Sequence, residues 1–160
     1  MDKELKLLAN KYGKRAVSDL KSKLVSDGTH ASGETLNSIN YSIKGGSIVV
    51  EFDAAINVLD EGLNTGQRIS ASGSQGIIRW MKAKGIRPAF AKGTVTERDY
   101  KASAFLITRA IRNRGTIRRF GYKGSNILSI FDSNSSFGTD LMNDIELWAQ
   151  NKVDNLLNNI

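Results

Sequence analysis

The sequence predicts an α+β fold in which a small sheet, based on an antiparallel β-hairpin, is packed by long amphipathic helices. Apolar and polar residues alternate on both sides of Gly45-Gly46. This alternation predicts strands over 39–44 and 47–52 with a tight turn between them, because glycine readily adopts the positive φ of such turns. Apolar residues also recur every three or four positions, as on one face of a helix, over three long segments: 3–26, 96–114 and 139–160.

Shorter elements are predicted between the long helices. One helical turn at 33–38 leads into the first strand, and residues 54–61 resume a helical pattern with Ala55, Val58 and Leu59 on the apolar side. The glycine-rich stretch 63–76 is interpreted as a flexible connector. A short helix is expected at 75–84 and a short buried strand at 127–131.

The apolar stripes indicate the faces by which the long helices pack, and for the first helix the sequence does not choose between a sheet and a neighbouring subunit as the partner. The first helix contributes Leu5, Leu8, Tyr12, Ala16, Leu20 and Leu24, with Gly13 as a weak point in the helix. The second contributes Tyr100, Ala104, Ile107 and Ile111, widened by Phe105 and Ala110. The third contributes Leu141, Ile145, Trp148, Ala149, Val153, Leu156 and Leu157. Trp80 could stack on a nucleobase, but its apolar neighbours favour a place in the core.

Composition sets the class of protein. The 160 residues are 40% apolar and 24% charged, as expected of one globular domain, and no apolar run has the length of a transmembrane helix. The absence of cysteine excludes disulfides, thiolate catalysis and cysteine-ligated metals, and it fits assembly in a reducing cytoplasm.

Charge is concentrated in the middle of the chain. The net charge is +7, but residues 67–123 hold 14 Lys and Arg against two acids, which gives this block +12 and leaves −5 for the rest. Such a block indicates an anionic partner, either nucleic acid or an acidic protein surface. A solvated basic face without a partner is the alternative.

Catalytic patterns are not recognisable in the sequence, so a non-enzymatic protein without a cofactor is predicted. His30, the single histidine, has no acidic cluster near it in sequence and is expected in a surface loop. Asp60 and Glu61 are adjacent on a predicted helix, and their side chains point about 100° apart rather than toward one ion. Gly66 and Gly73 lack the spacing of a phosphate-binding loop.

A basic loop follows the second long helix and is the main candidate interface. The helix dipole favours cations in the last turn of the helix, which accounts for Arg109, Arg112 and Arg114. It does not account for the cations that follow, Arg118, Arg119 and Lys123, which are interleaved with the aromatic residues Phe120 and Tyr122. We expect residues 116–125 to contact DNA or an acidic neighbouring subunit, with protein slightly favoured because aromatic residues and arginine are enriched in interfaces. A mobile loop with its aromatic side chains against its own core is the alternative.

The order of motifs resembles a known family. SGETLNSINYSI leads into the hairpin, a helix ending in LDEGLNTG follows it, and GIRPAF and AFLITRAI come later. This order, over most of residues 1–114, resembles the phage tail-completion and head–tail joining proteins, which include minor tail and neck components. The family's SG, leucine and serine before the first strand, and its acid and glycine after the hairpin, are matched by Ser32, Gly33, Leu36, Ser38, Glu61 and Gly62.

The resemblance implies a structural virion protein rather than an enzyme. The chain would be a single tail-completion-like domain over 1–160, with 115–138 as a candidate loop insertion, assembled in the bacterial host cytoplasm. It would form a homo-oligomeric ring at the phage neck or upper tail. Its partners would be portal, adaptor or tail-tube proteins and, non-specifically, packaged DNA, but no membrane.

A free basic nucleic-acid-binding protein is the alternative function. The basic block favours it. The helices predicted before and after Pro88 are, however, about a dozen residues apart, where a helix-turn-helix uses about three to four.

Overall fold

The computed structural model of the chain describes residues 2–28, 33–120 and 124–158, with the backbone alone at 117–120. His30, Ser32, Tyr122 and Lys123 therefore lie outside the described residues. The described part is mostly helical with a two-stranded antiparallel sheet, which agrees with a broad α+β class. Two compact units are present: unit 1 is Met1–Ser26, Leu36–Asp53 and Ile127–Ile160, and unit 2 is Asp27–Thr35 and Ala54–Asn126. The single domain and the loop insertion expected from the sequence stay predictions.

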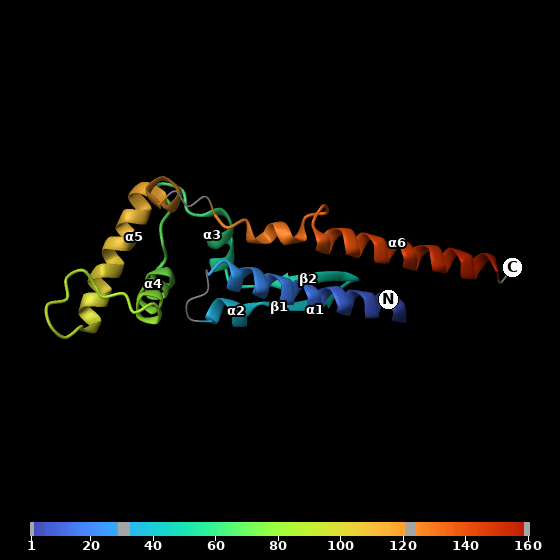
Figure 1. Cartoon of the computed structure of the whole chain (residues 1–160), viewed down its shortest axis with the longest axis horizontal. Helices are drawn as coiled ribbons and strands as arrows, with labels where there is room; N and C mark the ends of the chain where they lie inside the picture. Colours follow the sequence, from blue (N-terminus) through green and yellow to red (C-terminus); the bar gives the residue numbers. More distant parts are fainter. Residues whose placement is uncertain (1, 29–32, 121–123, 159–160) are drawn as a thin grey trace. The chain divides into compact units, whose positions relative to one another are not determined.

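Unit 1 is built from two long helices and the hairpin. Its helices are α1 (Lys3–Ser26), which has the predicted bounds, and α6 (Ser136–Leu157), preceded by the short 3₁₀ helix η1 (Ile127–Phe131). Figure 1 shows α1 and α6 running in opposite directions. Helix α1 contacts both strands, β1 (Asn40–Lys44) and β2 (Ser47–Glu51), as well as η1 and α6.

The predicted hairpin is confirmed. Strands β1 and β2 pair antiparallel with Tyr41 opposite Val50 and Lys44 opposite Ser47, and both turn glycines have positive φ, 58° at Gly45 and 87° at Gly46. Each strand is one residue shorter at its outer end than expected. The residue excluded from β1, Ile39, is completely buried.

The core of unit 1 lies between α1, the hairpin and the start of α6. Tyr12, Ala16 and Phe137 form its centre, and the partly buried side chains around them come from these elements and from η1: Leu8, Ile48, Val50, Phe131 and Leu141. The rings of Tyr12 and Phe137 meet edge to face with their centroids 5.6 Å apart. The stripe predicted on α1 is thus confirmed at its buried positions: Tyr12, Ala16, Leu20 and Leu24.

Tyr12 also joins α1 to α6 through a polar contact. Its hydroxyl donates to Asp144 Oδ2 at 2.9 Å, and Lys11 Nζ lies 2.6 Å from the same oxygen. Burial, and then the hydrogen bond to Asp144, raise the pKa of Tyr12 to about 12. The pKa of Asp144 is lowered by its hydrogen bonds from Lys11 and Tyr12.

Replacing Tyr12 with phenylalanine is expected to lower the free energy of unfolding by about 1–2 kcal/mol at pH 7, because it removes a partly buried hydrogen bond to a carboxylate. A free phenol has a pKa of about 10, so folding favours the protonated ring. That contribution is complete below pH 10 and is lost between pH 10 and about 12, as the pKa of Tyr12 requires. Urea unfolding at several pH values measures both effects.

Tyr100→Phe is the matched control for Tyr12→Phe, because among the described residues no hydrogen bond involves the Tyr100 hydroxyl. We expect it to change the free energy of unfolding by less than about 0.5 kcal/mol. Equal losses from both replacements would contradict the role given to the contact between Tyr12 and Asp144.

Two predictions for the C-terminal third were wrong. Residues 127–131 form the 3₁₀ helix η1 rather than a buried strand. Short apolar runs do not distinguish the two, and a strand needs a neighbouring strand, whereas β1 and β2 pair with each other. The last helix begins at Ser136 rather than Thr139, because the Ser135 hydroxyl caps it by accepting from the Gly138 amide at 3.0 Å.

Unit 2 contains α3 (Ala55–Glu61), α4 (Ala71–Ala83) and α5 (Glu97–Phe120), and the short α2 (Glu34–Ser38) spans the boundary between the units. Helices α4 and α5 pack together through Ile78, Met81 and Ala104. Helix α5 is interrupted at Gly115, with φ 65° and ψ 174°, so its regular part ends where the sequence predicted.

Several predictions for unit 2 were wrong. Helix α4 begins at Ala71 instead of 75, within the expected connector, because Ser70 Oγ accepts from the Gly73 amide at 3.1 Å. In α3 the buried side chain is Ile56, whereas the sequence predicted that Ala55, Val58 and Leu59 form the apolar side. Trp80 is 42% exposed and Phe105 is 63% exposed. Each lies beside the buried face of its helix, since neighbouring residues point about 100° apart.

Candidate functional site

The end of α5 and the segment before α4 are held together by backbone hydrogen bonds. The amide of Gly66 donates to the carbonyl of Arg112 at 2.7 Å, and the amide of Thr116 donates to the carbonyl of Leu63 at 2.8 Å. The Thr116 hydroxyl accepts from the Leu63 amide at 2.8 Å. These bonds form on both sides of Gly115, where the helix is interrupted. They place residues 63–69 against the last regular turns of α5.

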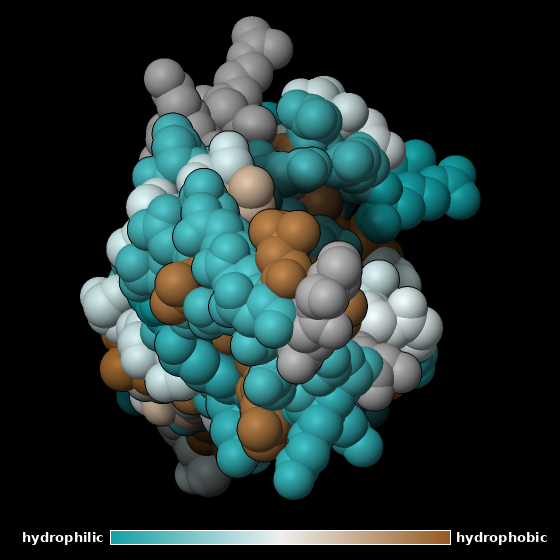
Figure 2. Space-filling model, turned by 90° about the vertical axis from the view of Figure 1, so that its right-hand side faces the viewer, coloured by the Kyte–Doolittle hydropathy of each residue, from teal (hydrophilic) through white to brown (hydrophobic). Residues whose placement is uncertain are grey.

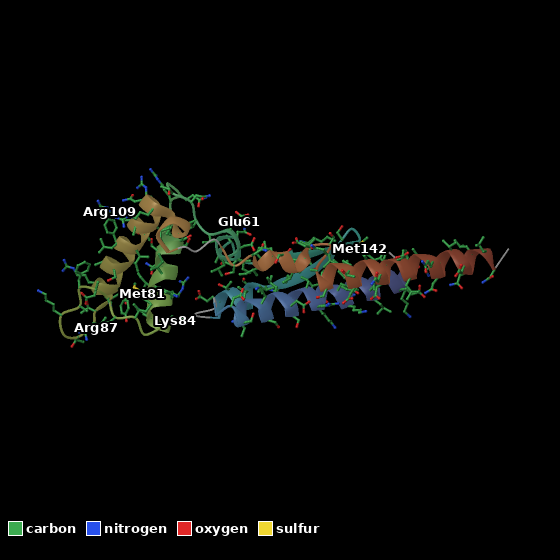
Figure 3. The ribbon with its side chains drawn as sticks, turned by 45° about the horizontal axis from the view of Figure 1, so that its top comes forward. Glu61, Met81, Lys84, Arg87, Arg109 and Met142 are labelled. Carbon is green, nitrogen blue, oxygen red and sulfur yellow. The ribbon has the colours of Figure 1, made fainter. Side chains whose placement is uncertain are left out.

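An open hollow of about 670 Å³ lies between these two segments. Three arginines, two apolar side chains and two polar ones line it: Arg68, Arg109, Arg112, Ile69, Phe105, Thr108 and Asn113. Phe105, Arg109 and Arg112 share one side of α5, because they are four and three residues apart. We call this feature the arginine hollow. Figure 3 labels Arg109 on α5.

The three arginines of the hollow are free of ion pairs within the described residues, and none of the described side chains that line it is acidic. Two of the other cations of unit 2 are paired, Arg79 with Glu34 at 3.0 Å and Lys82 with Glu97 at 2.6 Å. The hollow is therefore a place where positive charge is concentrated without a protein counter-charge, and it is suited to an anionic ligand.

Sequence reasoning identified two residues of the hollow, Arg109 and Arg112. It missed Arg68, which lies about 40 residues earlier in the chain, and it assigned Phe105 to the apolar stripe of its helix. The sequence did contain a signal for Phe105. Steps of four and three residues place Phe105, Arg109 and Arg112 on one helix face, so the ring lies beside cations. No local signal identifies Arg68.

The other predicted interface residues are separate from the hollow's lining. Arg114 is exposed at the end of the regular part of α5. The backbone at Arg118, Arg119 and Phe120 is helical, so the predicted loop was wrong over 116–120. The chain is helical again directly after Gly115. The Thr116 hydroxyl accepts from the Leu63 amide. Tyr122 and Lys123, predicted in the same loop, lie outside the described residues.

The residues that match the family motif have local structural roles. Ser38 Oγ accepts from the Asp53 amide at 3.0 Å, which closes the open end of the hairpin. Leu36 is half-buried in α2. Gly62 ends α3, with its amide donating to the Val58 carbonyl at 2.9 Å, and Glu61 before it is exposed (Figure 3). Gly33 has a φ of 77°, and Ser32 lies outside the described residues.

A second surface lies on α6 of unit 1. The predicted stripe of this helix is half-buried only at Leu141 and at Trp148, and the rest of it is exposed, including Val153 at 54% and Leu156 at 69%. Met142, which the prediction did not include, is 62% exposed. The exposed face, which we call the α6 stripe, consists of Met142, Ile145, Ala149, Val153 and Leu156. In the view of Figure 2, hydrophobic side chains reach the surface among hydrophilic ones.

The α6 stripe is exposed because α1 covers mainly another side of the helix. Asp140 and Asp144 of α6 pair with Arg15 and Lys11 of α1, and Lys152 pairs with acids at the start of α1. On a helical projection Asp140 and Asp144 lie more than a third of a turn from the middle of the α6 stripe, whereas Lys152 lies at the edge of the stripe, about a sixth of a turn away. Steps of three and four residues keep the stripe on one face from 142 to 156.

Other kinds of site were considered among the described residues. None of their His, Cys, Asp and Glu side chains form a group of three or more that could hold a metal ion. No described helix is long and apolar enough to cross a membrane. Comparison of the chain with family models, curated proteins and solved structures finds no match.

Proposed function

We propose that this chain is a non-enzymatic structural subunit that assembles into a ring at the head–tail junction or upper tail of a bacteriophage. The observation that supports assembly is the α6 stripe, and the placement in a phage comes from the resemblance in sequence. Its partners would be further copies of the chain and proteins such as the portal, an adaptor or the tail tube. Packaged DNA would pass close to the basic unit 2.

The α6 stripe supports assembly because its side chains are costly to leave in water. Four of its five residues are large and apolar, and each contributes about 1.5–3 kcal/mol when fully buried. The stripe follows one side of the helix for about 21 Å, at 1.5 Å for each residue from 142 to 156. Contiguous apolar surface of this kind marks protein contacts.

The test of assembly is the mass of the purified protein by sedimentation velocity, with images of negatively stained particles. The parent chain is expected to form oligomers, and Val153→Glu together with Leu156→Glu is expected to shift the assembly constant at least 100-fold toward monomer. Burying two carboxylates at the centre of an apolar contact costs at least about 3 kcal/mol. Asn143→Glu with Asn151→Glu adds the same charge elsewhere on α6 and should assemble like the parent.

Two results would contradict this proposal at different levels. A monomer at every concentration, or equal assembly of the stripe variant and its control, would remove the role given to α6. An oligomer that is absent from intact virions, as judged by mass spectrometry of purified particles, would remove the phage assignment and leave self-assembly standing.

Free nucleic-acid binding remains the second candidate function, and the arginine hollow favours it. The size of the protein at low and high salt, with and without DNA, distinguishes the two. A ring subunit retains its mass without DNA, whereas a free binder is small until nucleic acid is added.

A further inference from the structure

We propose that the arginine hollow of unit 2 binds single-stranded nucleic acid, with phosphate groups on Arg68, Arg109 and Arg112 and an unpaired base stacked on Phe105. The inference goes beyond the assembly proposed for α6, and it does not depend on a ring or on a virion. It assigns a ligand class, an orientation and four residues to a surface of unit 2.

Two properties of the cations favour phosphate binding: they are arginines, and they form no ion pairs within the described residues. Arginine presents a planar fork of N–H donors that matches phosphate oxygens in pairs, which lysine cannot do. All three arginines are without ion pairs in the part of the chain that the structure describes. A ligand phosphate therefore does not have to displace a carboxylate before it binds.

The base-stacking part depends on Phe105. Its ring is 63% exposed and lies four residues before Arg109 on the same side of α5. An aromatic ring beside cations is the arrangement by which proteins hold single strands, since bases stack on the ring while the cations follow the backbone. A base inside a duplex is stacked on its neighbours and cannot reach the ring. The hollow is therefore expected to prefer single strands.

Hydrogen bonds hold together the two segments that form the hollow. Residues 63–69 are fastened to α5 by the hydrogen bonds of Gly66, Leu63 and Thr116, at 2.7–2.8 Å. Arg68 comes from this segment, and the other two arginines come from the helix, so cations approach the hollow from two sides. Thr108 and Asn113 add neutral hydrogen-bonding groups, which suit sugar and phosphate oxygens.

An acidic protein segment is the competing occupant. The cores of protein interfaces are depleted in charged residues, whereas three of the seven side chains that line the hollow are arginines and only two are apolar. Specific and non-specific nucleic-acid surfaces, by contrast, are dominated by contacts to phosphate. The lining therefore favours nucleic acid.

The experiment measures fluorescence anisotropy of a labelled single-stranded oligonucleotide, its duplex and labelled poly-glutamate with the full chain. Arg109→Ala with Arg112→Ala is expected to weaken single-strand binding at least 10-fold. It should also reduce the slope of log affinity against log salt by about 1.4, since each phosphate contact on a single strand contributes about 0.7. Phe105→Leu should weaken single-strand binding about 5- to 20-fold and leave duplex binding unchanged.

Lys84→Ala with Lys92→Ala is the matched control, because it removes the same charge from exposed positions of unit 2 outside the hollow's lining. It should weaken binding less than 3-fold. Arg68→Ala, in the segment before α4, tests the hollow independently of α5 and should weaken binding at least 3-fold. Circular dichroism of each variant establishes that it is folded.

Three results would overturn the proposal. Equal losses from the hollow variant and the lysine control would show that only diffuse charge attracts nucleic acid. Equal affinity for duplex and single strand, unchanged by Phe105→Leu, would remove the stacked base. Tighter binding of poly-glutamate than of the oligonucleotide, lost in Arg109→Ala with Arg112→Ala, would assign the hollow to an acidic protein partner.

Discussion

Replacing Gly13 with alanine is expected to lower the free energy of unfolding by about 2 kcal/mol, although alanine is the better helix former. Gly13 is buried in α1 beneath the ring of Tyr41, and an added Cβ would overlap Cδ2 and Cε2 of that ring and lie 2.9 Å from its Cγ. The ring cannot simply swing away, because the Tyr41 hydroxyl donates to Asn10 Oδ1 at 3.2 Å. The hairpin that carries Tyr41 would have to move off α1.

Gly76→Ala is the matched control for Gly13→Ala. Gly76 also lies inside a helix, and no atom is within 4 Å of the position its Cβ would take. The same chemical change should therefore raise the free energy of unfolding by about 0.5–1 kcal/mol, which is the intrinsic gain from glycine to alanine. Thermal and urea unfolding measure both variants. A stabilising effect of Gly13→Ala would show that the contact between α1 and the hairpin is looser than described.

Replacing Gly115 with alanine is expected to lower the free energy of unfolding by about 3 kcal/mol and to open the arginine hollow. The φ of 65° with ψ of 174° is accessible almost only to glycine, and forcing another residue into it costs about 1–3 kcal/mol. An added Cβ would also lie 2.6 Å from the carbonyl oxygen of Leu63. Backbone atoms cannot turn aside, so the bonds between Leu63 and Thr116 would break or lengthen.

Gly85→Ala separates the two causes. Gly85 has nearly the same φ, 64°, but no atom lies within 4 Å of its Cβ position, so only backbone strain of about 1–2 kcal/mol is expected. Hydrogen exchange gives a second readout, because the amides of Gly66 and Thr116 should exchange faster in Gly115→Ala and not in Gly85→Ala. Equal effects of the two replacements on stability and exchange would exclude the close approach as a cause.

The ends of several elements were predictable because their causes are local. Gly45-Gly46 determines the turn of the hairpin, and the register follows from it. Thr96 and Asp99 begin α5 by bonding to each other's backbone amides, at 3.4 and 2.8 Å, in a pattern that is visible in four residues. The caps at Ser70 and Ser135 have the same physics. They were missed because serine is common in loops as well.

The arginine hollow was only partly predictable. The count of charges identified a basic block in the middle of the chain. The predicted end of the second long helix placed Arg109 and Arg112 within this block, on one side of the helix. Arg68 joins them only because the segment before α4 bonds to the end of α5. Which cations stay unpaired is likewise a matter of distance, as the pairs Arg79–Glu34 and Lys82–Glu97 show.

The sequence by itself determined the hairpin, the span of α1, the end of the regular part of α5 and the sign of the charge on the middle of the chain, since each depends on neighbouring residues. Only the tertiary structure decided which apolar faces are buried. An apolar stripe shows which face of a helix could be buried, but the face is buried only where a second element packs against it. Helix α1 has the hairpin on its stripe, whereas the large side chains of the α6 stripe stay exposed, from 38% at Ile145 to 69% at Leu156.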